Sequence, residues 1–96
     1  MMQFSFEVGF HEKHVVMVNY NQMIGVLSIF VDDREVIREQ RTFSLSLVRK
    51  YELTVGEAER HTVRIEKKRK LLLAGLRPQK FSVFVDGQLI REYEGM

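Results

Sequence analysis

The segment Phe81-Ser82-Val83-Phe84-Val85-Asp86-Gly87 contains the two signals on which the fold prediction depends. Phe81, Val83 and Val85 occupy every second position, and a side-chain period of two is typical of a β-strand. Asp86-Gly87 then favours a two-residue type I′ hairpin turn, because Asp and Gly tolerate the positive φ angles that this turn needs. A strand that ends in a tight hairpin predicts antiparallel pairing.

The same strand and turn signals recur along the chain. Apolar residues alternate with polar ones in the segments 4–8, 42–48, 51–55 and 62–66. Val15–Val18 and Val26–Val31 are apolar at nearly every position, which is typical of central strands covered on both faces. Asp32-Asp33 is a weaker hairpin signal. About eight strands at roughly 8–12-residue spacing predict an antiparallel β-sandwich or barrel.

Two segments carry signals for a helix as well. Asp33–Arg41 has good helix formers and an Asp at its start, but its only apolar residues are Val36 and Ile37, so a helix there would bury little. Glu66–Ala74 is rich in Lys, Arg, Leu and Ala, and Gly75 follows where a helix often ends. We expect a strand in the first segment and leave helix or loop open for residues 66–75.

An internal echo suggests a repeat. Phe30-Val31-Asp32 is followed by Ile37-Arg38-Glu39, and Phe84-Val85-Asp86 is followed by Ile90-Arg91-Glu92. The spacing differs by one residue, which a bulge or a change in loop length could absorb. The echo fits either two hairpins that converged on the same turn chemistry or a duplication that gives a pseudo-symmetric pair of sheets. Both interpretations favour a hairpin after Asp32.

Composition excludes several classes of protein. The chain of 96 residues predicts one domain, 1–96, and its 45% hydrophobic and 29% charged content argues against disorder. No apolar run approaches the ~18 residues that span a bilayer, and the first residues lack the basic segment of a signal peptide. The absence of cysteine excludes thiol catalysis, disulfides and Cys-ligated zinc. We therefore expect a cytoplasmic protein without membrane association.

The charge balance and the candidate catalytic groups predict a protein that is not an enzyme. Fifteen basic and 13 acidic residues give a net charge of only +2, which does not by itself imply a nucleic-acid partner. In His11-Glu12-Lys13-His14 the histidines are three residues apart, whereas the zinc-protease pattern needs four, and His61 is not placed by spacing as a third ligand. These histidines are interpreted as surface residues flanking a strand. The serines fall in predicted strands, and the sequence has no Gly-x-Ser-x-Gly and no Gly-rich phosphate loop. No metal or cofactor is expected.

The order of several short motifs resembles the Fas apoptosis inhibitory molecule family. The resemblance covers roughly Val15 to Tyr93, and its motifs are Val31-Asp32, Ile37-Arg38, Phe43 with Leu45, Leu53-Thr54-Val55-Gly56, His61-Thr62-Val63-Arg64-Ile65 and Phe81 to Gly87. It departs at Gln40-Arg41-Thr42, where the family carries a tryptophan, and in the more apolar segment 71–79. The resemblance implies a compact all-β module with two four-stranded sheets. It also implies a cytosolic, non-enzymatic regulator of cell death that is reported to protect against protein aggregation.

Four leucines stand in a connection between predicted strands and are the candidate partner-binding residues: Leu71, Leu72, Leu73 and Leu76. Full burial of each would contribute roughly 1.5–3 kcal/mol, so a monomer would not leave all four in water. They either close one end of the core or form a surface for another protein or for a second copy, as in a homodimer.

The alternative function is single-stranded nucleic-acid binding. A candidate basic patch consists of Arg64, Lys67, Lys68, Arg69, Lys70 and Arg77, with Phe81, Phe84 or Tyr51 available to stack on bases. The same cations, in a loop over 67–70, could instead stay solvated and protect a sheet edge from aggregation. The sequence therefore predicts a non-catalytic protein-interaction module that uses Leu71–Leu76 or an unpaired edge strand, with nucleic-acid binding through 67–70 as the alternative.

Overall fold

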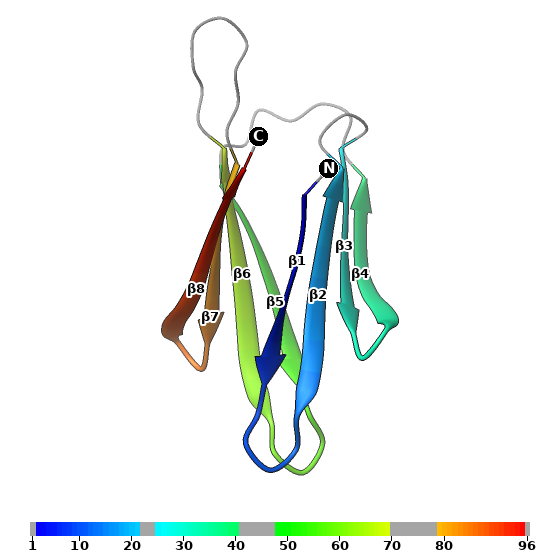
Figure 1. Cartoon of the computed structure of the whole chain (residues 1–96), viewed down its shortest axis with the longest axis vertical. Coiled ribbons are helices and arrows are strands. Elements are labelled where there is room, and N and C mark those ends of the chain that lie inside the picture. The colour runs from blue at the N-terminus through cyan, green and yellow to red at the C-terminus, as the bar shows by residue number, and fades with distance from the viewer. Residues whose placement is uncertain (1, 22–24, 41–47, 70–78, 96) are drawn as a thin grey trace, which may run out of the picture. The chain divides into compact units, whose positions relative to one another are not determined.

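The computed structural model describes residues 2–21, 25–40, 48–69 and 79–95. The strands are β1 (Met2–Val8), β2 (His14–Asn21), β3 (Val26–Val31), β4 (Arg34–Gln40), β5 (Val48–Val55), β6 (His61–Arg69), β7 (Gln79–Val85) and β8 (Gln88–Gly95). They form two four-stranded antiparallel sheets, in the orders β1-β2-β3-β4 and β5-β6-β7-β8 (Figure 1). The predicted all-β fold class is confirmed. In the part of the chain that the structure describes, no helix is long and apolar enough to cross a membrane.

The two candidate helices have different outcomes. Arg34–Gln40 is strand β4, as expected. Strand β6 continues to Arg69, so Lys67, Lys68 and Arg69 lie in a strand, and the prediction of a loop over 67–70 is wrong for these three residues. The loop was predicted because four consecutive cations are expected to stay in water. A strand also allows this, since Lys and Arg can lay their aliphatic stems along a sheet and keep their charges in water. Residues 70–78 lie outside the described residues, and so do residues 42–47 of the strand predicted at 42–48.

Alternation explains which side chains are buried. In β1, Phe4, Phe6 and Val8 are buried, whereas the residues between them are exposed. The remaining buried apolar side chains are Val16, Val18, Tyr20, Leu27, Ile29, Tyr51, Val55, Val63, Ile65, Phe81 and Val83. Strands β2 and β3 are central in their sheet, as predicted. The expectation that β2 is covered on both faces is wrong, because Val15 is 49% exposed.

Both predicted tight turns have the backbone that a type I′ turn needs. Asp32 and Asp33 have φ angles of 50° and 66°, and Asp86 and Gly87 have 52° and 81°. The side chain of the first aspartate of each turn also accepts a hydrogen bond from the neighbouring strand outside its hairpin, which is β2 for Asp32 and β6 for Asp86. Asp32 Oδ1 accepts the Val15 N–H at 2.9 Å, and Asp86 Oδ1 accepts the matching N–H in β6 at 2.9 Å.

The structure corrects the alignment of the internal echo. Each of the hairpins β3–β4 and β7–β8 has a bulge at the same place, after Ile29 in the first and after Val83 in the second. Ile37 pairs with Ile29, and Arg91 pairs with Val83, so Ile37 is equivalent to Arg91 and not to Ile90. The two hairpins therefore have equal spacing. The structure therefore contains the repeat, but the sequence match of residues 37–39 with residues 90–92 is shifted by one residue from the structural equivalence.

The chain divides into two compact units. The first consists of Met1–Ser44 and Val55–His61, and the second of Leu45–Thr54 and Thr62–Met96. The sheet β1–β4 belongs to the first unit together with the loop between β5 and β6. The prediction of a single domain remains a prediction.

Candidate functional site

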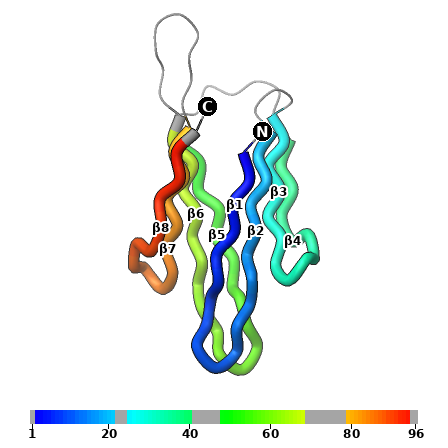
Figure 2. Tube along the Cα trace, in the orientation of Figure 1, coloured from blue at the N-terminus to red at the C-terminus, as the bar shows by residue number. Residues whose placement is uncertain are grey.

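Two hairpin loops of the first unit lie side by side (Figure 2). Residues 9–13 join β1 to β2, and residues 56–60 join β5 to β6. Each loop begins with a glycine at a φ angle that side chains rarely adopt: 109° at Gly9 and 102° at Gly56. A Cβ atom at either glycine would lie 1.9 Å from a backbone oxygen, that of Glu12 or Glu59 respectively. Both loops therefore need glycine at their first position.

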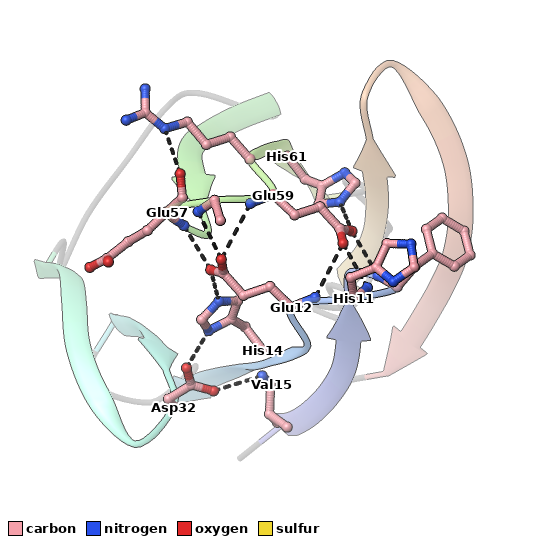
Figure 3. Close-up of polar contacts among 11 residues, drawn as sticks. His11, Glu12, His14, Val15, Asp32, Glu57, Glu59 and His61 are labelled. Carbon is pink, nitrogen blue, oxygen red and sulfur yellow. Dashed lines mark hydrogen bonds and ion pairs between the residues drawn. The ribbon is translucent and has the colours of Figure 1, made fainter.

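Each loop places a carboxylate against the backbone of the other loop (Figure 3). The Glu12 carboxylate accepts the N–H groups of residues 57–59, at 2.7, 2.8 and 3.3 Å. The Glu59 carboxylate accepts the N–H groups of residues 10–12, at 2.7, 2.7 and 3.2 Å. We call Glu12, Glu59 and these six N–H groups the carboxylate clasp. It joins residues 45 to 49 positions apart in the sequence.

A histidine completes each half of the clasp. His61 Nε2 donates to the Glu59 carboxylate. His14 Nε2 contacts the Glu12 carboxylate, and its Nδ1 contacts Asp32. Because a carboxylate only accepts, both ring nitrogens of His14 donate, which requires the imidazolium form. The hydrogen bond to Asp32 and then that to Glu12 raise the pKa of His14 above its ordinary value of 6.5.

These contacts hold both glutamates in the charged form. The hydrogen bond from His14, followed by those from the backbone, lowers the pKa of Glu12 to about 2. The corresponding bonds, with His61 first, lower the pKa of Glu59 to about 2. Each carboxylate accepts four hydrogen bonds, two at each oxygen, which is its full capacity. Neither glutamate has a lone pair left for a metal ion or for a proton from a substrate, so the clasp stabilises the loops and is unsuited to acid–base chemistry.

The histidine motif singled out in the sequence therefore has a structural explanation. His11 is exposed in the loop before β2, whereas His14 is the first residue of β2 and its side chain is half-buried. The sequence did not indicate that His14 contacts the carboxylates of Glu12 and Asp32, or that Glu12 accepts N–H groups of the other loop. Among the described residues, no group of three or more His, Cys, Asp or Glu is placed to hold a metal ion.

A repeated sequence signal could have revealed that the two loops are equivalent. The pattern Val-Gly-x-x-Glu-Lys/Arg-His occurs at Val8–His14 and again at Val55–His61. Every residue that the clasp requires is present in both copies. The two central positions differ: the first loop has Phe10-His11 where the second has Glu57-Ala58.

Phe10 is the most exposed large apolar side chain among the described residues, at 80%. It borders an open hollow of about 620 Å³, here called the tip hollow, which is lined by Phe10, His11, Glu12, Ala58 and Glu59. The N–H of Phe10 is held by Glu59, so the backbone that carries the ring is fixed. The tip hollow is the candidate binding site.

The structure does not gather the predicted basic patch on one face. Arg64 lies over the Phe84 ring at 4.4 Å, and its Nε is 3.0 Å from Glu66 Oε2. Lys68 lies on the same face of β6 as Arg64, whereas Lys67 lies on the opposite face, because successive side chains of a strand alternate. Arg69 is in β6, and the remaining predicted residues of both sites, Lys70, Leu71, Leu72, Leu73, Leu76 and Arg77, lie outside the described residues.

No protein-family model matches the sequence, and no curated protein matches it. Functional inference therefore depends on the site itself.

Proposed function

We propose that the protein is a non-catalytic protein-interaction module that binds its partner at the tip hollow, with Phe10 as the main contact. One observation carries the proposal: Phe10 is 80% exposed at a position where the equivalent loop has Glu57. Because the second loop forms the same clasp with a glutamate there, loop formation does not require an aromatic residue. Aromatic side chains are enriched at protein interfaces.

The clasp supports this role by fixing the binding surface before a partner arrives. Three N–H groups of each loop are hydrogen-bonded to a charged carboxylate. Ordering a flexible loop on binding costs free energy, and a preformed loop avoids most of that cost. The resemblance to the Fas apoptosis inhibitory molecule family, whose members are non-enzymatic regulators, agrees with the proposal.

Nucleic-acid binding is the weaker alternative. Acidic residues are interleaved with the cations of the second sheet: Glu66 lies between Arg64 and Lys68 on one face of β6, and Glu92 pairs with Lys80 at 3.0 Å. These carboxylates reduce the positive potential that phosphate binding needs. Dimer formation through Leu71–Leu76 remains a prediction, which light scattering on the purified protein tests.

Selection of displayed random peptides on the immobilised protein tests the proposal. We expect enriched peptides whose affinity falls at least about tenfold in a Phe10→Glu variant, which installs the residue of the equivalent loop. Val48→Glu is the matched control, because Val48 is 46% exposed and is the first residue of β5, at the opposite end of that strand from the loop 56–60. Peptides that bind wild type and Phe10→Glu equally well would show that the tip hollow is not the binding surface. A gel-shift assay with single-stranded DNA and RNA at physiological salt tests the alternative.

A further inference from the structure

We infer that the tip hollow binds the guanidinium group of an arginine from the partner protein, stacked on the Phe10 ring beside the Glu12 and Glu59 carboxylates. This inference rests on the proposed function and names the group that the partner supplies. It is carried by the hydrogen-bonding state of the loops, by the charges that line the hollow and by a comparable contact elsewhere in the chain.

The loops cannot serve as an anion site. Backbone N–H groups at tight turns often bind phosphate or carboxylate ligands. Here the N–H groups of residues 10–12 and 57–59 all donate to the two glutamates of the clasp. The chain therefore fills its own anion site with its own carboxylates, and an anionic ligand would find these donors already occupied.

The lining of the tip hollow favours a cation. Two of its five residues, Glu12 and Glu59, carry negative charge, and neither Lys nor Arg lines it. The His14 imidazolium offsets part of this charge, but it is shared between Glu12 and Asp32, so the carboxylates still outnumber it. Their pKa values of about 2 keep both carboxylates ionised at neutral pH. Because their oxygens already accept four hydrogen bonds each, they attract a cation through their field and leave the direct contact to the Phe10 ring. A ring face attracts cations through its quadrupole.

The second sheet contains the same combination of groups in an intramolecular contact. The Arg64 guanidinium carbon lies 4.4 Å from the centre of the Phe84 ring, and Arg64 Nε lies 3.0 Å from Glu66 Oε2. This contact brings an aromatic face, a carboxylate and a guanidinium together on one surface. The tip hollow has the aromatic ring and nearby carboxylates and lacks the guanidinium. It differs in one respect: Glu66 contacts Arg64 directly, whereas Glu12 and Glu59 would act only through their charge. A planar guanidinium stacks on a ring better than the compact ammonium of lysine, which is why we name arginine.

Titration of the isotope-labelled full-length protein with N-acetyl-arginine N-methylamide, followed by NMR, tests the inference. The uncharged citrulline derivative of the same shape is the matched control ligand. We expect shift changes concentrated at the amides of residues 10–12 and 57–59, with the arginine derivative bound more tightly than the citrulline derivative. Phe10→Ala should weaken arginine binding roughly two- to fivefold, and Val48→Ala should leave it unchanged.

Three results would overturn the inference: equal binding of the citrulline derivative, unchanged binding in Phe10→Ala, or no shift changes at the two loops. If Phe10→Ala fails to fold, Phe10→Leu replaces it, because leucine keeps an apolar side chain of similar size and removes only the aromatic ring face that the inference requires. The proposed function would survive any of these results if selected peptides still lose affinity in Phe10→Glu. It would fail together with the inference only if no peptide discriminates that variant.

Discussion

Replacing Gly9 with alanine should destabilise the protein far more than the same replacement at Gly87. Both glycines have positive φ angles, 109° and 81°. They differ in their surroundings: a Cβ atom at Gly9 would lie 1.9 Å from the backbone oxygen of Glu12, whereas a Cβ atom at Gly87 would have nothing within 4 Å. Gly87→Ala therefore adds only backbone strain, and Gly9→Ala adds a clash that the backbone must move to relieve.

The expected losses in unfolding free energy follow from this difference. A single L-residue in the left-handed region costs about 1–2 kcal/mol, which is the expectation for Gly87→Ala. For Gly9→Ala we expect about 3 kcal/mol or more, because the displaced segment carries both the donors and the carboxylate of the clasp. Gly56→Ala should match Gly9→Ala, since its Cβ atom would lie 1.9 Å from the backbone oxygen of Glu59.

Urea unfolding followed by circular dichroism measures these losses, and buried Tyr20 and Tyr51 provide a fluorescence signal in a chain without tryptophan. A loss of 1 kcal/mol corresponds to a fall in Tm of about 4–8 °C for a chain of this size. The steric reasoning is refuted if Gly9→Ala costs no more than Gly87→Ala. The equivalence of the two loops is refuted if the losses at Gly9 and Gly56 differ widely.

Three further predictions concern charges. The free energy of unfolding should decrease as the pH falls from 4.5 towards about 2, because Glu12 and Glu59 have a pKa of about 2 in the folded protein and the unfolded chain takes up protons first. Urea titrations at different pH values measure this decrease, which should be shallower in Glu12→Gln. His14 contributes with the opposite sign: its raised pKa stabilises the fold below pH 6.5, and this contribution is lost as the pH rises through the raised value, so His14→Gln should lose more stability at about pH 6 than at about pH 9. Arg64→Met should change the free energy of unfolding by less than about 1 kcal/mol, because Met17 occupies the equivalent position in the first sheet. The same urea titrations at neutral pH measure this change.

The strands and the tight turns could be predicted because their causes are local. Alternation in Phe4–Val8 sets which side chains are buried, and Asp86-Gly87 supplies the positive φ angles of the turn within two adjacent residues. The cations of β6 misled the prediction because the alternation of apolar and polar residues ends at Glu66. Lys67 stands where an apolar residue would continue the pattern, yet residues 67–69 still pair with β7.

The clasp could not be predicted from local patterns, because its bonds join residues that are far apart in the sequence. Glu12 lies in a loop, and no local rule indicates that its carboxylate accepts N–H groups of residues 57–59. The spacing of His11 and His14 does not fit the zinc-protease pattern, but spacing alone does not indicate that His14 contacts Glu12 and Asp32. Alignment of the two Val-Gly-x-x-Glu segments would have indicated equivalent loops, but reciprocal contact between them depends on tertiary structure.

The internal repeat separates residues that the fold needs from residues that it does not. Where both copies keep a residue, one physical demand explains both: glycine avoids a backbone clash, glutamate pairs with three N–H groups, and the turn aspartates tolerate positive φ and bind the neighbouring strand. Where the two copies have different residues at an exposed position, the shared fold does not explain which residue stands there. Phe10 in place of glutamate at the loop tip is such a position, and Leu89, 48% exposed where the equivalent hairpin has Glu35, is another. The repeat therefore gives no folding reason for these exposed apolar side chains, and at Phe10 the proposed contact with a partner protein would supply one.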